Sequence, residues 1–355
     1  MNLKSQRFTR SPLKWAALKA DAHVGMVTIL SVSKSSEEAF CRLPQNIHKI
    51  KKNFKLLNMK KLFEVPYNFS LSIIPFYKKY SSCISFLFLP PYKEDSINTR
   101  TVIETRRKGR CYMPTTRAEY EKHIQKIQEA GLRCVVLWQL PTEIITNKIL
   151  DYYRSLGVSG FIIGNDQNAK IIKDFDSDLL VIASLVQRIS KGIIQRDFSN
   201  YNYVLLYYPF NRALDALKKL SFMKEKIILM PNTLCHVACP SVHHWFPTKD
   251  KPFVKRRDCW LFSHKDNYIL NCGFISPEHL YLFDNYVAGY KLQGREYCTE
   301  LVEYICQTYF ERDSPNELLH DLLGERMSTQ LLDSMNSMEL NEYYNAKTND
   351  ILDHI

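Results

Sequence analysis

Four cysteines are the residues of this 355-residue sequence best suited to chemistry, because they fall together in one polar, loop-like region. They are Cys235, Cys239, Cys259 and Cys272. Of the ten cysteines in the chain, Cys83 and Cys134 lie instead inside apolar runs, which is typical of small buried residues. We expect a cytoplasmic protein with reduced thiols, in which clustered cysteines indicate a metal site rather than disulfides.

The spacing of these cysteines favours an iron–sulfur cluster over zinc, and we expect a cluster of the [4Fe–4S] type. Thiolates are soft ligands that suit either. The Cys235-x3-Cys239 pair, followed by two distant cysteines, lacks the paired C-x2-C knuckles of a zinc ribbon. Two alternatives stay open: a zinc site of three cysteines and one histidine, and thiols that bind no metal. The candidate histidines are His243, His244 and His264.

Three further side chains are candidates for catalysis at the same site. Lys291 and Arg295 flank Gly294, where they would face an anionic substrate or the cluster. Alternatively, Arg295 begins the helix that follows. His244 would serve as an acid–base group or a ligand, although histidines in loops are commonly plain surface residues.

Two substrate-binding candidates, Tyr67 and Asn165, each follow an apolar run. Instead of binding substrate, these segments could have purely structural roles at the starts of helices. Tyr67 and Asn68 would cap a helix beginning near Phe69, and Asp166 after Asn165 would be the N-cap of the next helix.

Eight short apolar runs are expected to form strands. They are Leu62–Val65, Cys83–Phe88, Cys134–Trp138, Gly160–Ile163, Leu180–Ser184, Tyr203–Tyr207, Ile227–Met230 and Val287–Leu292. The runs are continuous rather than alternating in polarity, which is typical of parallel strands buried on both faces.

Helical patterns separate these runs. Thr116 and Glu119 form a capping box that begins a helix, and Gly131 ends it. Ser276 and Pro277 begin a short helix as N-cap and first helical residue. The other helices are expected at about 143–155, 211–222, 295–310, 316–323 and 329–335.

Strands alternating with helices predict either a closed barrel or an open doubly wound sheet. The chain has only 11 glycines and no G-x-G-x-x-G phosphate loop, so we expect a (β/α)8 TIM-type barrel. Its seventh and eighth strands are joined by an unusually long loop that carries the four cysteines. In such barrels the residues that do chemistry gather at the C-terminal ends of the strands.

The charge of the chain disfavours nucleic-acid binding by the barrel. Of the net charge of +11, residues 1–61 hold 13 Lys and Arg against three acidic residues, whereas residues 62–355 hold 35 against 34. A nucleic-acid footprint would instead be a basic stripe on the folded surface. No apolar stretch approaches the ~20 residues of a membrane span.

The sequence predicts three parts. Residues 1–58 form a basic N-terminal extension without a core pattern, which is expected to be disordered or dispensable. Residues 59–312 form the barrel, and residues 313–355 form an acidic helical tail.

Motifs near the end of the barrel resemble those of the collagenase-like peptidase family, which includes the iron–sulfur proteins of oxygen-independent ubiquinone hydroxylation. The resemblance spans about residues 62–311 and is diagnostic over 231–297. The matching segments are Asn232-x2-Cys235-x3-Cys239-Pro240, then Cys259, then Phe274-Ile275-Ser276-Pro277-Glu278-x-Leu280, and Gly289-Tyr290-Lys291-Leu292-Gln293-Gly294-Arg295. It implies the barrel fold and cluster ligation by Cys235, Cys239 and Cys259, with Cys272 as the candidate fourth ligand. His279 and Gln293 depart from the family pattern, in which Asp and Glu are common at these positions.

These observations predict an iron–sulfur barrel acting in redox or oxygen-independent modification of a small or peptide substrate. Three cysteine ligands would leave one iron with an open position. The first alternative is a peptidase, as the name of the resembled family implies, but the sequence has no H-E-x-x-H, no G-x-S-x-G and no recognisable Ser/His/Asp set. The second is a non-catalytic subunit that pairs with a partner protein and whose metal only holds the long loop in place.

Overall fold

A computed structural model describes seven segments of the chain: residues 61–96, 114–189, 192–235, 272–295, 297–314, 316–323 and 339–352. The chain divides into one unit of Met1–Met59 and one of Lys60–Ile355. The first unit lies outside the described residues, as do Cys239, Cys259, His244 and the expected helix at 329–335. Among the described residues, no helix combines the length and apolar character needed to cross a bilayer.

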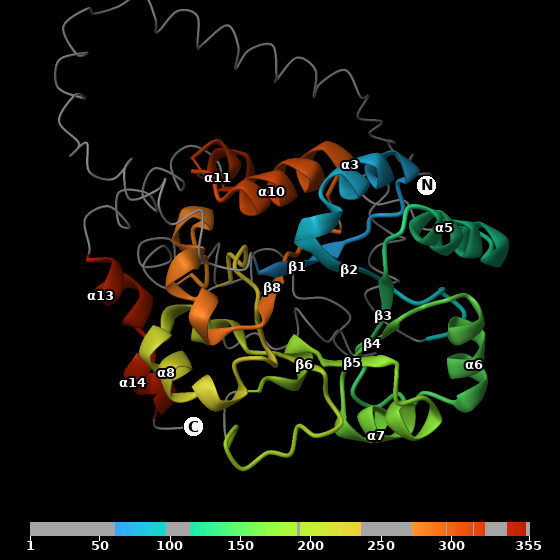
Figure 1. Ribbon diagram of the computed structural model, residues 1–355, viewed down its shortest axis with the longest axis horizontal. Helices are drawn as coiled ribbons and strands as arrows, with labels where there is room; N and C mark the ends of the chain where they lie inside the picture. The colour runs from blue at the N-terminus through green and yellow to red at the C-terminus, as the bar shows by residue number, and fades with distance from the viewer. Residues whose placement is uncertain are drawn as a thin grey trace, which may run out of the picture. The chain divides into compact units, whose positions relative to one another are not determined.

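Eight parallel strands form a closed barrel in chain order, with β1 paired to β8 (Figure 1). The strands are β1 (Leu62–Pro66), β2 (Ile84–Leu89), β3 (Cys134–Trp138), β4 (Gly160–Ile163), β5 (Leu180–Ala183), β6 (Tyr203–Leu205), β7 (Ile227–Leu229) and β8 (Gly289–Lys291). Each falls within or next to one of the expected apolar runs. The predicted (β/α)8 barrel is therefore confirmed.

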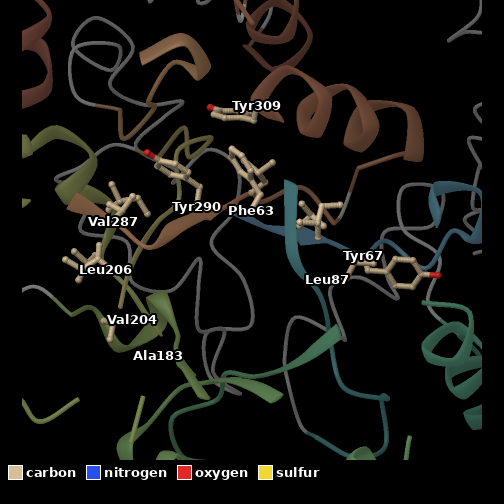
Figure 2. Packing of buried hydrophobic residues seen from close by; sticks show 14 of the residues in the cluster. Phe63, Tyr67, Leu87, Ala183, Val204, Leu206, Val287, Tyr290 and Tyr309 are labelled. Atoms are coloured by element: carbon tan, nitrogen blue, oxygen red, sulfur yellow. The ribbon is translucent and has the colours of Figure 1, made fainter. Parts of the chain in front are cut away.

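Alternate strand residues point to opposite faces of the barrel wall. Those directed outward pack in one large cluster with the surrounding helices, as Phe63 and Tyr290 do with the helical residue Tyr309 in Figure 2. Phe63 and Tyr290 sit on neighbouring strands with ring centroids 5.5 Å apart. Residues directed inward form a separate apolar cluster of six: Phe86, Phe88, Val135, Leu137, Ile162 and Ile182. The barrel interior is thus packed on this side.

The helix α5 (Arg117–Glu129) begins as its sequence predicts. Thr116 is the N-cap, and its side chain accepts a hydrogen bond from the Glu119 amide. The Glu119 carboxylate reaches back to the Thr115 amide, one residue earlier than the expected capping box. Gly131 follows the helix with φ of 74°, a conformation that side chains other than glycine rarely adopt.

Other helices are shorter than expected. Helix α6 (Asn147–Ser155) starts four residues late, after the N-cap Thr146. The expected helix at 211–222 is broken into the 3-10 helix η4 (Tyr208–Arg212), α8 (Leu214–Lys219) and the 3-10 helix η5 (Ser221–Met223). The break lies at Ala213, whose φ of −141° is not helical.

The segment after the long loop also differs from its prediction. Pro277 begins a 3-10 helix, η10 (Pro277–Leu282), and the Ser276 side chain makes no capping hydrogen bond. Helix α10 (Thr299–Glu311) begins four residues after Arg295. The alternative in which Arg295 begins this helix is therefore wrong.

The C-terminal tail is helical where it is described, in α11 (Asn316–Leu323), α13 (Leu340–Asn345) and α14 (Thr348–Leu352). Arg212 of η4 joins α13 to the barrel. Its Nε donates to the Tyr343 carbonyl at 2.6 Å, one Nη donates to the Cys272 carbonyl at 3.2 Å, and the guanidinium lies 3.5 Å from the centre of the Tyr343 ring. Arg212 therefore links the tail to Cys272, the last of the four cysteines between β7 and β8.

Removal of residues 1–58 is expected to leave a folded chain with an unchanged thermal unfolding midpoint. The barrel wall starts at Leu62, and β1 finds both of its partners, β2 and β8, inside the second unit. Size-exclusion chromatography and thermal unfolding monitored by circular dichroism check this. Deletion of residues 1–66 is the control, since it also removes β1 and opens the barrel. Aggregation of the shorter deletion would contradict the domain boundary.

Candidate functional site

A small cavity of about 50 Å³ lies where the C-terminal ends of the strands meet. Residues from six of the eight strands, or from the loops that directly follow them, line it. They are Phe88, Leu137, Gln139, Leu185, Val186, Leu205, Met230, Lys291, Gln293, Gly294 and Arg295. A space of this size accepts a few water-sized groups, which suits the head group of a ligand. Its position is the one that the sequence predicts for the site.

Lys291 and Arg295 are the charged residues of this lining, and both are buried. Lys291 ends β8, and Arg295 follows it through Gly294, whose φ is +133°. A Cβ at Gly294 would lie 2.9 Å from the Tyr297 ring, so a side chain there would displace this loop. The glycine allows the chain to turn so that both cations reach one cavity.

Glu64 is buried in the barrel interior beside Lys291, and no motif in the sequence marks it as a site residue. Glu64 of β1 and Lys291 of β8 are partners in the strand register, and their carboxylate Oε2 and Nζ lie 3.3 Å apart. The Lys291 ammonium also lies 3.1 Å from the centre of the Phe88 ring. Burial raises the pKa of Glu64, and the charge of Lys291 opposes that rise. The signal in the sequence was one acidic residue within an otherwise apolar strand, Leu62–Pro66.

Two amide side chains complete the polar part of the lining. Gln139, just after β3, donates from Nε2 to the Ser184 hydroxyl at 2.7 Å. Gln293 is held by Asn232 in three hydrogen bonds of 2.8 to 2.9 Å, which join the loop after β7 to the loop after β8. Asn232 and Gln293 both belong to the motifs quoted above, and their geometry gives them a role in fixing these two loops.

Tyr67 and Asn165, expected to bind substrate, do not line this cavity. The Tyr67 side chain is buried against α5, where its hydroxyl lies 2.7 Å from His123 Nδ1. Asn165 is the N-cap of α7 (Asp166–Phe175), and its Oδ1 accepts from the Asn168 amide at 2.8 Å. Neither residue lines the cavity, so both expectations are corrected for it. The expected N-cap of α7 is corrected as well, because the cap is Asn165 and Asp166 is the first helical residue.

The two described cysteines of the predicted metal set belong to different packing clusters. Cys235 is half-buried and packs on an apolar group that includes Leu205 and Met230 of the cavity wall. Cys272 is fully buried in the cluster outside the barrel wall. Burial raises the pKa of its thiol, an effect that the nearby Arg212 guanidinium opposes. Because the Cys272 side chain packs in a different cluster from Cys235, we expect the two thiols not to hold the same metal.

The backbones around these cysteines are nevertheless joined, because the Gly273 amide donates to the Cys235 carbonyl at 2.9 Å. The two ends of the cysteine loop therefore lie side by side at the barrel mouth. Within the described segments, no group of three or more His, Cys, Asp or Glu side chains is arranged to hold a metal. Cys239, Cys259 and His244 lie outside those segments.

No protein-family model matches the sequence, and no curated protein matches it. Among solved structures, the chain is similar to a U32 peptidase at 10% sequence identity and a TM-score of 0.40, over 67% of this chain and 95% of the other. It is also similar to an HpcH/HpaI aldolase from Desulfitobacterium hafniense at 8% identity and a TM-score of 0.29, over 73% and 94% of the two chains. Values this low do not establish a family.

Proposed function

We propose that the cavity at the strand ends binds the anionic group of a small molecule or peptide. We further propose that Cys235, Cys239 and Cys259 hold an iron–sulfur cluster beside it, as in the collagenase-like peptidase family whose motifs the sequence resembles. The proposed activity is redox or oxygen-independent modification of that ligand.

The observation that carries the anion site is the convergence of Lys291 and Arg295 on one buried cavity. Buried lysine and arginine side chains are usually paired, because removing a charge from water is costly. Lys291 is paired with Glu64, and its ammonium has further donors to offer an anion in the cavity. Apolar walls around them, including Leu185 and Met230, lower the local dielectric and strengthen each contact with an anion. A carboxylate is one of the groups that a guanidinium binds through strong, charge-assisted hydrogen bonds.

Support for the cluster comes from the sequence motif and from the position of Cys235. This residue follows β7 at the barrel mouth and packs on side chains that also line the cavity. A group held by Cys235 would therefore be next to the anion site. Such a cluster supplies electron transfer, and with three cysteine ligands it also supplies one open iron position.

Arg295→Ala is expected to weaken binding of acetate, the simplest carboxylate probe, by about 10- to 100-fold. A hydrogen bond to a charged group contributes about 1.5–3 kcal/mol, and each 1.4 kcal/mol changes an affinity tenfold. Titration by nuclear magnetic resonance or calorimetry measures the change. The metal content should stay the same.

The control for this variant is Arg133→Ala. Arg133 is exposed and precedes β3, so it lies at the opposite end of the barrel from the cavity. Its loss should leave acetate binding unchanged. Equal binding by Arg295→Ala and the unmodified protein would refute the anion site, and so would an absence of acetate binding in the unmodified protein.

A further inference from the structure

A buried carboxylate lies directly beside one of the two cations of the cavity. The Glu64 side chain is 2% exposed and that of Lys291 is 6% exposed, and their charged atoms are 3.3 Å apart. Because the two residues are register partners on adjacent strands, the barrel wall itself fixes this proximity. The Phe88 ring covers the ammonium from another side.

The charge of Glu64 acts on any anion that contacts Lys291. Coulomb repulsion between two negative groups grows in proportion to the charge of each, so a dianion is repelled twice as strongly as a monoanion at the same place. Salt screens such a buried interaction much less than it screens a surface pair. Lys291 and Arg295 attract an anion in proportion to its charge as well, but together with ionised Glu64 these groups carry only one net positive charge. The cost of removing an anion from water grows with the square of its charge, so one net positive charge compensates a monoanion better than a dianion.

We infer that Glu64 is the residue that restricts this cavity to singly charged anions, so that its natural ligand is a monocarboxylate and not a phosphate ester. The inference rests on the anion site proposed above and adds the class of ligand. Glu64 acts through Lys291 and through its own field, and it is not part of the cavity lining.

A dianion could still bind if Glu64 first took up a proton. The groups that face Glu64 set how readily this happens: Lys291 from β8, and Phe86, its register partner on β2, which does not titrate. Burial raises the pKa of Glu64 while Lys291 lowers it. A carboxyl group with a raised pKa takes up a proton at a pH above the usual range. Binding of a dianion should therefore be coupled more strongly to proton uptake than binding of a monoanion.

The test compares methanesulfonate with sulfate, which have nearly the same shape but carry one and two negative charges. Calorimetry on the unmodified full-length chain at neutral pH should give methanesulfonate an affinity at least about tenfold higher than sulfate. In Glu64→Gln, which keeps the shape of the side chain, this ratio should fall by about tenfold or more. Glu129→Gln is the matched control, because it removes a carboxylate that pairs with Lys126 on the exposed surface of α5.

A second measurement needs no variant. Calorimetry in two buffers of different ionisation enthalpy should reveal more proton uptake when sulfate binds to the unmodified chain than when methanesulfonate binds. Equal affinities for the two anions, or sulfate binding without proton uptake, would overturn the role of Glu64 while leaving the anion site intact. If acetate and methanesulfonate both fail to bind, the anion site itself is wrong, and the inference falls with it.

Discussion

Cys235→Ala is expected to abolish the brown colour and the iron content of the protein purified without oxygen. Each cysteine of a three-cysteine set supplies one thiolate that a neighbouring side chain does not replace. Cys235 is the described member of that set, and it is half-buried at the barrel mouth, on the apolar wall shared with the cavity. Absorbance spectra with iron and sulfide analysis measure the loss.

Two other alanine variants make this experiment specific. Cys272→Ala should keep its iron, because the Cys272 thiol is fully buried in the packing outside the barrel wall. Cys298→Ala should also keep it, since Cys298 is exposed at the start of α10. Colourless protein with stoichiometric zinc would replace the iron–sulfur proposal by the zinc alternative. Loss of iron in Cys272→Ala would return that residue to the ligand set.

Arg212→Ala should lower the free energy of unfolding by about 3 kcal/mol or more. The substitution leaves two buried carbonyl acceptors, those of Tyr343 and Cys272, without their donor, at about 1–3 kcal/mol each. It also removes the cation stacked on the Tyr343 ring and leaves a cavity in its place. Denaturation by urea measures the change, and limited proteolysis reports whether residues 339–352 detach first.

Arg154→Ala is the surface control for this variant. Arg154 pairs with Asp176 at 2.8 Å, but its side chain is 51% exposed. Exposed ion pairs contribute about 1 kcal/mol or less. If the two variants lost similar stability, Arg212 would not be the link between the tail and the barrel that its contacts indicate.

The strands were predictable because the barrel covers every one of them on both faces. A parallel strand covered on both faces needs a continuous apolar run, and runs such as Cys134–Trp138 and Gly160–Ile163 match the observed strands residue for residue. Helix boundaries were harder to predict. The break at Ala213 follows from tertiary contacts, since Asn211 beside it donates to the carbonyls of Met230 and Gly273.

The site residues likewise divide into those that the sequence predicts and those that depend on tertiary contacts. Lys291 and Arg295 were predictable as residues of the mouth, because the C-terminal ends of all parallel barrel strands lie on one face of the barrel. Tyr67 also follows the end of a strand, but successive side chains point to opposite faces, and that of Tyr67 points outward to His123 on α5. Glu64 was missed for the opposite reason. Its position within a strand does not suggest a site until β8 is known to pair with β1.

The pairing of β1 with β8 also bears on how the chain folds. The ion pair across that seam joins residues 227 positions apart, so it forms only after most of the chain has been synthesised. Contacts so distant in sequence slow folding, because the loss of chain entropy precedes the gain from packing. Until the seam closes, β1 exposes an unpaired edge, and such edges favour aggregation in partly folded chains. We therefore expect the nascent chain to need protection by chaperones until Lys291 has left the ribosome.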